Sequence, residues 1–214
     1  NHKVFAMKDA PPREHPFLVV MDSVDSPDSA RTLLDPGEMD KDGLSAIDWF
    51  VPSHDGSKVA VSISRAGTES GELYIVDTSS TKVEGPIITH VNGATAGGSL
   101  SWDADDKGFF YTRYPRDTER TGDDLNFYVQ VYHHTIGEDP AKDRYELGGD
   151  FPKIAEIELK THRESGRVIA TVQDGDGGDF AHFIRQPADG KWTRIANFKD
   201  GIKQAYFGDD DAVF

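Results

Sequence analysis

Residues 97–115 read Gly97-Gly-Ser-Leu-Ser-Trp-Asp-Ala-Asp-Asp-Lys-Gly-Phe-Phe-Tyr-Thr-Arg-Tyr-Pro115, and this stretch decides the fold. Two short apolar runs, one ending at Trp102 and one beginning at Phe109, flank an acidic segment that ends in a glycine. Aromatic and β-branched residues suit a pleated, half-buried surface, and Asp and Gly favour tight turns. The pattern therefore predicts a β-hairpin. A hairpin by itself indicates an architecture and not an activity.

The same hairpin pattern recurs along the chain. Residues 48–64 contain it with an Asp-Gly turn, residues 154–173 contain it again, and residues 204–214 begin a further copy. The equivalent turn positions lie 50, 59 and 45 residues apart, at Asp55, Asp105, Glu164 and Asp209. Loops of variable length would produce this scatter. We therefore expect a repeat protein.

Each hairpin is followed by two further strand candidates. They are residues 72–77 and 86–91 in the first complete unit, 127–133 and 143–147 in the second, and 180–185 and 191–196 in the third. An incomplete unit with strands at 3–8, 16–21 and 31–34 precedes them. Four antiparallel strands per unit, with a period of about 40–50 residues, are typical of a β-propeller blade. We predict an all-β fold, a partial β-propeller of about four blades.

The units also predict the domain organisation. We expect residues 1–214 to form one partial propeller domain, with an incomplete unit at 1–36, complete units at 46–92, 97–148 and 152–198, and the start of another at 202–214. A β-sandwich is the alternative, but it does not explain a hairpin that opens every unit. No segment is typical of a long amphipathic helix, since the nearest candidate, residues 28–34, is too short.

Composition and charge exclude several classes of partner. The 214 residues include 38 acidic and 23 basic side chains, for a formal net charge of −15. Because binding to a phosphate backbone needs a basic stripe, we expect no nucleic-acid partner. The composition is that of a soluble globular domain, and no window approaches the ~18 apolar residues of a membrane span. The lack of cysteine excludes disulfides and thiolate metal sites, but it leaves a cytoplasmic or a periplasmic compartment open.

Both ends of the sequence interrupt the repeat. Residues 1–8 contain neither an initiator Met nor a signal peptide, and they resemble the second strand of a hairpin. The hairpin that begins at residue 204 breaks off at residue 214, and the acidic run 209–211 is expected to be its turn. We therefore expect a segment of a longer protein.

No motif in the chain predicts catalysis, metal binding or a cofactor. The run 97–101 departs from the Gly-x-Ser-x-Gly nucleophile elbow at its last position and precedes no helix, so Ser99 is predicted to be a strand residue. His133 and His134 are neighbours on a strand and point to opposite faces, which does not suit a metal site. The loop 174–179 lacks the glycine and the final carboxylate of a calcium loop. We expect no catalytic residue, no metal ligand and no cofactor.

Five segments together resemble the propeller domain of bacterial prolyl oligopeptidases. They are Ala46-Ile-Asp-Trp-Phe-Val-Pro-Ser-His-Asp-Gly56, Thr95-Ala-Gly-Gly-Ser-Leu-Ser-Trp102, Gly108-Phe-Phe-Tyr-Thr-Arg-Tyr-Pro115, residues 124–128 with 131–133, and Gly175-Asp-Gly-Gly-Asp-Phe-Ala-His182. The resemblance covers nearly the whole chain. It implies a serine peptidase that cleaves oligopeptides after proline. Its α/β-hydrolase domain would carry a Ser-Asp-His triad, and a seven-bladed propeller would cap the active site and exclude folded proteins.

By this resemblance, the chain would be the substrate-gating portion of such a peptidase. It would span part of the first blade to the start of the fifth and lack the catalytic domain, so we expect it to be inactive alone. The implied partners are an oligopeptide substrate and the hydrolase domain. A propeller that only binds proteins or peptides is the alternative. Because an incomplete ring exposes sheet faces and edge strands, self-association through open blade faces is also expected.

Five residues are candidates for the substrate channel. In certain members of the family an aromatic residue and a cysteine precede the tryptophan that matches this hairpin, whereas here Gly97, Gly98 and Ser99 leave more room and fewer contacts. Arg113 and Asn126 are polar residues in otherwise apolar stretches. They could contact a peptide, although a structural hydrogen bond would explain them as well.

Overall fold

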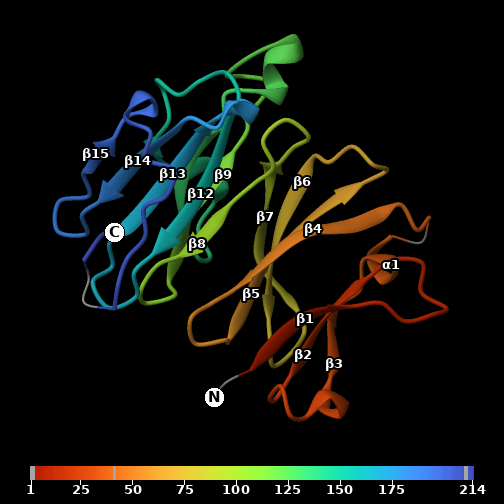
Figure 1. The fold of residues 1–214 in the computed structure, drawn as a ribbon. Helices are drawn as coiled ribbons and strands as arrows, with labels where there is room; N and C mark the ends of the chain where they lie inside the picture. Colours follow the sequence, from red (N-terminus) through yellow and green to blue (C-terminus); the bar gives the residue numbers. More distant parts are fainter. Residues whose placement is uncertain (1–2, 41, 210–211) are drawn as a thin grey trace. The chain divides into compact units, whose positions relative to one another are not determined.

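The computed structural model describes residues 3–40, 42–209 and 212–214, and in them β-strands joined by tight turns dominate (Figure 1). The strands form four antiparallel sheets. The chain divides into two compact units, Asn1–Thr89 and His90–Phe214. Within the described residues no helix has the length and hydropathy needed to cross a bilayer.

The first unit contains two sheets. The three-stranded sheet consists of β1 (Val4–Lys8), β2 (Phe17–Met21) and β3 (Arg31–Leu34), in that order. The second sheet consists of β4 (Ser45–Pro52), β5 (Lys58–Arg65), β6 (Gly71–Asp77) and β7 (Val83–Asn92), whose last residues pass into the second unit. Branched apolar side chains from both sheets form one core, which includes Leu18, Val20, Val59, Val61 and Val76.

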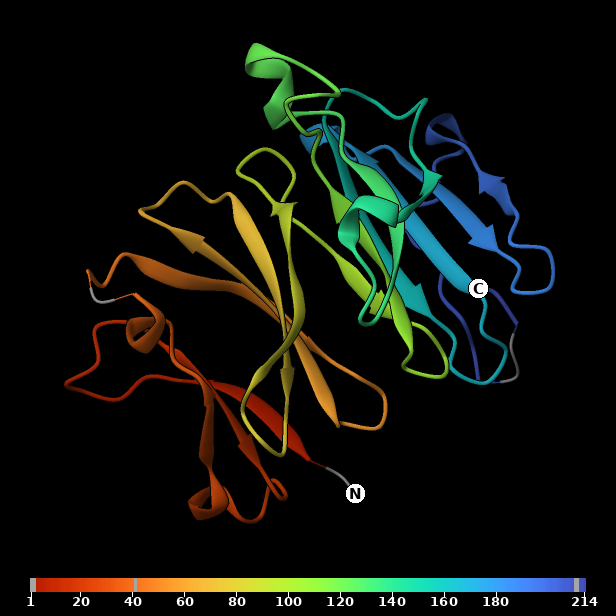
Figure 2. The same ribbon diagram turned by 180° about the vertical axis from the view of Figure 1, so that it is seen from behind.

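The second unit also contains two sheets, which lie face to face in both views (Figures 1 and 2). One has the order β11-β10-β9-β8 and consists of β8 (Leu100–Trp102), β9 (Gly108–Arg113), β10 (Gln130–Thr135) and β11 (Arg144–Leu147). The other consists of β12 (Ala155–Thr161), β13 (Val168–Asp174), β14 (Phe180–Arg185) and β15 (Trp192–Ala196). The core between them includes Phe110, Val131, Ile157, Leu159, Val172 and Phe183.

The alternation of side chains along β12 positions the site described below. Ala155, Ile157 and Leu159 are buried in the core, so Glu156 and Glu158 point away from it. Each large apolar side chain buried in this way stabilises the unit by about 1.5–3 kcal/mol. The apolar face of β12 thus fixes the direction in which its two glutamates point.

The hairpin at residues 97–115 forms as predicted, with Trp102 opposite Phe109 and their rings packed edge to face at 5.4 Å. The all-β prediction is confirmed, and three of the four sheets have four antiparallel strands. Strand β10 lies further along the chain than predicted, at Gln130–Thr135 instead of residues 127–133. The preceding residues form a 3-10 helix (Gly122–Asn126), and Tyr128 adopts φ +59°. That dihedral cannot continue a strand.

One further segment differs from the prediction. The short helix α1 (Pro36–Met39) was not expected; Asp35 caps it by accepting a hydrogen bond from the Gly37 N–H at 2.9 Å. Residues 28–34, too short to predict a helix, contain the end of a 3-10 helix (Pro27–Ser29) followed by β3, the strand predicted at 31–34. The predicted turn at 209–211 lies partly outside the described residues, but Phe207 and Val213 on either side of it form an antiparallel bridge.

Candidate functional site

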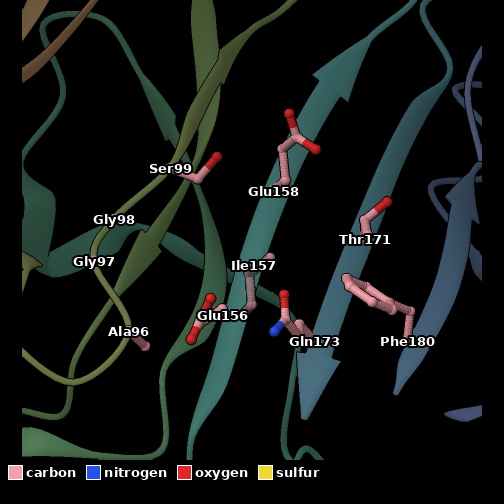
Figure 3. Close-up of a pocket in the computed structure, with 10 residues that line it drawn as sticks. All are labelled: Ala96, Gly97, Gly98, Ser99, Glu156, Ile157, Glu158, Thr171, Gln173 and Phe180. Carbon is pink, nitrogen blue, oxygen red and sulfur yellow. The ribbon is translucent and has the colours of Figure 1, made fainter. Parts of the chain in front are cut away.

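Gly97, Gly98 and Ser99 line a pocket of about 330 Å³ in the second unit, here called the Gly97 pocket (Figure 3). The segment before β8 forms one wall, and strands β12, β13 and β14 form the rest. The other lining residues are Ala96, Glu156, Ile157, Glu158, Thr171, Gln173 and Phe180. The structure therefore brings three of the five predicted site residues together.

The glycine at position 97 has two consequences for this pocket. Its φ of +61° lies in the left-handed region, which favours glycine. A Cβ atom built on Gly97 would meet no atom within 4 Å. The backbone conformation thus selects a residue without a side chain, and the space beside it stays open.

Ser99 joins the two sheets of the second unit. It lies one residue before β8, not within a strand as predicted, and its hydroxyl accepts a hydrogen bond from the backbone N–H of Leu159 at 3.0 Å. Two residues on, the Ser101 hydroxyl accepts from the N–H of Thr161 at 2.8 Å and lies 2.8 Å from that residue's Oγ1. Since β12 is an edge strand of its sheet, these N–H groups point away from β13 and need acceptors. The two serines supply them.

The charged lining of the Gly97 pocket is acidic. Glu158 pairs with Lys160 at 2.8 Å, but both side chains are 61% exposed, so this ion pair contributes little. The amide of Gln173 donates to the carbonyl of Gly175 at 2.8 Å. Together with the ring of Phe180, the glutamates give the pocket polar and aromatic walls.

Arg113 lies outside the Gly97 pocket and is held by the protein. Its side chain is only 3% exposed, and its guanidinium donates two hydrogen bonds to the carboxylate of Glu119, at 2.8 and 2.9 Å. A further hydrogen bond runs to the carbonyl of Tyr114 at 3.1 Å, and the guanidinium lies over the ring of Tyr132 at 4.0 Å. Hydrogen bonding to Arg113 lowers the pKa of Glu119 to about 2.

Asn126 is exposed at the end of the 3-10 helix before β10. Its backbone carbonyl accepts a hydrogen bond from the hydroxyl of Thr95. Its side chain lines neither the Gly97 pocket nor the pocket beside Arg113 among the residues that the structure describes. The structure therefore does not bring Asn126 together with the other candidates.

Tyr114, which the sequence analysis missed, holds the wall of the Gly97 pocket. Its hydroxyl accepts from the N–H of Ala96 at 2.9 Å and donates to the carbonyl of Gly93 at 3.1 Å. The ring lies so close to Gly93 that a Cβ there would be 2.7 Å from the ring carbon Cζ. The glycine at position 93 was the one available signal, because such a close approach excludes any side chain.

The two neighbouring histidines contact different carboxylates. His133 Nε2 lies 2.9 Å from Asp103 Oδ2, and His134 Nδ1 lies 2.7 Å from Asp143 Oδ1. The hydroxyl of Tyr111 also donates to Asp143 at 2.7 Å, and burial raises the pKa of Tyr111 well above its usual range. Among the described residues no group of three or more histidines and carboxylates is arranged to hold a metal ion. These contacts tie strands together inside one sheet.

Comparison with known proteins places this chain in a family. Residues 1–197 match the family model of the prolyl oligopeptidase N-terminal β-propeller domain. A prolyl oligopeptidase of Omphalotus olearius, ophP, is 35% identical over 120 residues, covering 50% of this chain and 16% of that protein. A prolyl endopeptidase of Elizabethkingia meningoseptica is 28% identical over 133 residues, covering 60% and 18%. The chain thus spans less than a fifth of the length of these relatives.

Solved structures show the same fold. A structure from an analysis of two prolyl endopeptidases superposes with a TM-score of 0.83 at 19% identity, covering 97% of this chain and 30% of that chain. Prolyl oligopeptidase B of Galerina marginata, bound to a 35mer substrate, gives a TM-score of 0.75 at 16% identity, covering 96% and 30%. These structural similarities confirm the predicted partial β-propeller and not the alternative β-sandwich fold. With the family model matching residues 1–197, the chain belongs to the prolyl oligopeptidase N-terminal β-propeller family.

Proposed function

We propose that this chain is the substrate-gating portion of a prolyl oligopeptidase-like serine peptidase that cleaves oligopeptides after proline. The match of residues 1–197 to the family's propeller domain carries this proposal. The chain contains no Gly-x-Ser-x-Gly sequence, so the serine nucleophile, its histidine base and the orienting aspartate would belong to an α/β-hydrolase domain outside these residues. The propeller contributes exclusion of folded proteins and positioning of the peptide.

The same proposal assigns the domain boundaries. The four sheets are consecutive blades of one propeller domain at 1–36, 46–92, 97–148 and 152–198, with a further blade beginning at 202–214. The contact between β8 and β12 supports the assignment for the second unit, because these are the first strands of their sheets and lie side by side. In a propeller the blades surround a central channel, and in the proposed parent peptidase this channel would lead the substrate to the catalytic domain.

The Gly97 pocket is the proposed peptide contact on that channel. It lies where β8 and β12 meet, and glycines replace side chains on one of its walls. Arg113 and Asn126 are the weaker candidates, since the first is bound by Glu119 and the second is exposed and outside the pocket. We therefore expect the pocket to accept bulky peptide side chains.

A filling substitution in the parent peptidase tests this contact. Gly97→Phe should lower kcat/KM for an oligopeptide that carries a bulky residue on the N-terminal side of its proline. It should leave the cleavage of a minimal proline reporter unchanged. Gly97→Ala is the matched control, because it carries the same backbone strain at φ +61° without filling the pocket. Equal kinetics of Gly97→Phe and Gly97→Ala on both substrates would remove the pocket from the peptide path.

The parent gene tests the function as a whole. The sequence that follows residue 214 should encode Gly-x-Ser-x-Gly and, after it, the aspartate and the histidine of a triad. Their absence would overturn the peptidase assignment and favour a propeller that only binds proteins or peptides.

The proposed partners are an oligopeptide, the hydrolase domain and, for the isolated chain, a second copy. Exposed apolar side chains in the C-terminal stretch of the second unit support self-association, and they include Ile202, Tyr206 and Phe214. Light scattering of concentrated chain should give the mass of a dimer or larger species. A monodisperse monomer would contradict this expectation.

A further inference from the structure

A second pocket, here called the Arg113 pocket, has a volume of about 440 Å³ and lies in the same unit as the Gly97 pocket. Its lining consists of Arg113, Tyr114, Pro115, Glu119, Arg120, Tyr128, Gln130 and Tyr132. The charged side chains among these are two arginines and one glutamate, whereas those of the Gly97 pocket are two glutamates. In a chain of net charge −15, a pocket with an excess of positive charge needs an explanation.

Arg113 is the buried cation among the residues that line this pocket. The fork of its guanidinium is filled by the carboxylate of Glu119, with N–O distances of 2.8 and 2.9 Å. This planar, two-pronged geometry is the one that arginine uses to recognise a carboxylate. Its Nε is the one buried side-chain nitrogen or oxygen in the described part of the chain without a hydrogen-bond partner. A buried donor of this kind is costly unless an acceptor reaches it.

Arg120 brings the second positive charge and is held loosely. Its guanidinium lies 3.6 Å from the centroid of the Tyr128 ring, and its Nη1 lies 4.0 Å from Asp124 Oδ2. The side chain is 37% exposed, so its N–H groups can turn to a ligand. Tyr128 itself adopts φ +59°, a strained conformation of the kind that clusters at ligand sites.

Glu119 differs from the arginine it neutralises. Its side chain is 40% exposed, while that of Arg113 is 3% exposed. Moving this carboxylate out to solvent would break its hydrogen bonds to Arg113 and to the N–H of Arg116 at 2.8 Å, but it would restore the hydration of the carboxylate. The buried guanidinium would then need another anion. Glu119 occupies the fork as an internal carboxylate that a second carboxylate can replace.

We propose that the Arg113 pocket binds a carboxylate of a peptide ligand, with Glu119 as its internal competitor and Arg120 as the second cation. The proposal rests on the proposed function only for the ligand being a peptide. Tyr114 connects the two sites, because it lines the Arg113 pocket while its hydroxyl holds Ala96 in the wall of the Gly97 pocket. One peptide could thus place a side chain in the Gly97 pocket and a carboxylate in the Arg113 pocket.

Nuclear magnetic resonance of the 15N-labelled chain tests the site directly through the Nε–H signal of Arg113. N-acetylglycine represents a peptide C-terminus, N-acetylglutamic acid α-amide represents an acidic side chain, and N-acetylglycinamide is the uncharged control. We expect the signal to shift in a saturable way with at least one of the acids and not with the amide. The acid that binds more tightly identifies the source of the carboxylate.

Variants assign the roles of the two flanking residues. Glu119→Gln should bind the acid about tenfold more tightly because the internal competitor has lost its charge, and Arg120→Gln about tenfold more weakly. Arg113→Lys keeps the charge but loses the fork, and should also weaken binding. Glu158→Gln, a change of the same chemistry in the Gly97 pocket, is the matched control and should leave the affinity unchanged.

Three outcomes would overturn the proposal: no saturable shift with either acid, an equal shift with the amide, or no tightening in Glu119→Gln. If Arg113→Lys does not fold, as judged by circular dichroism, the Glu119 and Arg120 variants still decide the question. The readout uses neither proline peptides nor catalysis. A parent gene without a catalytic triad would therefore overturn the proposed peptidase function without affecting the carboxylate-binding result. Conversely, a lack of carboxylate binding would not contradict the proposed gating function.

Discussion

Removing the two serine hydroxyls that join β8 to β12 should destabilise the second unit measurably. In Ser101→Ala the N–H of Thr161 loses its acceptor, and in Ser99→Ala the N–H of Leu159 does so. A buried donor left without a partner costs about 1–3 kcal/mol, and a partly solvated one costs about 1 kcal/mol. Because Ser101→Ala also removes the hydrogen bond that the Ser101 hydroxyl donates to Thr161 Oγ1, we expect Ser101→Ala to cost more than Ser99→Ala. The double variant should lose about 2–4 kcal/mol if the two contacts act independently.

Urea denaturation and amide hydrogen exchange measure this effect together. The denaturation midpoint should fall in both variants, and exchange should accelerate most at Leu159 and Thr161, the residues whose N–H groups have lost their acceptors. Ser70→Ala is the control, since Ser70 is exposed and lies in the first unit. An unchanged midpoint in the double variant, or exchange that accelerates evenly along β12, would refute the reasoning.

Three further substitutions test other contacts of the second unit. Hydrogen bonding to Arg113 lowers the pKa of Glu119 from 4.5 to about 2, so the Glu119 carboxylate stabilises the fold above pH 4.5 and this contribution is lost as the pH falls toward 2. The free energy of unfolding of Glu119→Gln should therefore be lower than that of the wild type at pH 7 and approach it near pH 2. Tyr111→Phe removes a hydrogen bond to buried Asp143 and should lower the free energy of unfolding by about 1–3 kcal/mol, and an unchanged value would contradict a stabilising role for this bond. Gly93→Ala places a methyl group 2.7 Å from the ring of Tyr114 and should cost about 1–3 kcal/mol in thermal unfolding, and an unchanged melting temperature would mean that the ring moves freely.

The repeating part of the fold could be predicted from sequence because it is local. A hairpin needs only two apolar runs and a turn between them, and residues 100–113 contain all three within a short stretch. β10 was predicted to begin three residues too early for a related reason. The apolar pattern of residues 127–129 continues into the strand, but Tyr128 turns to a positive φ, and its N–H bonds to the carbonyl of Lys153 in a distant part of the chain.

The contacts that make the site could be predicted only in part. Gly97 and Ser99 were identified because the sequence departs there from the pattern of the family it resembles, but the partner of Ser99 on β12, the N–H of Leu159, lies 60 residues away and no local pattern indicates it. Arg113 was recognised as a polar residue in an apolar stretch, yet its partner Glu119 sits in an irregular loop whose path the sequence does not determine. The contact of Ser99 with Leu159 depends on how two sheets meet, and the contact of Arg113 with Glu119 depends on the path of one loop.

The central claim, that this chain gates a catalytic domain which it does not itself contain, is tested most directly by hydrolysis of a proline-linked reporter peptide. The purified chain should release no product, and the parent protein that carries the downstream domain should cleave the reporter on the carboxyl side of proline. Hydrolysis by the purified chain alone, with full-length enzyme excluded by mass spectrometry, would contradict the account.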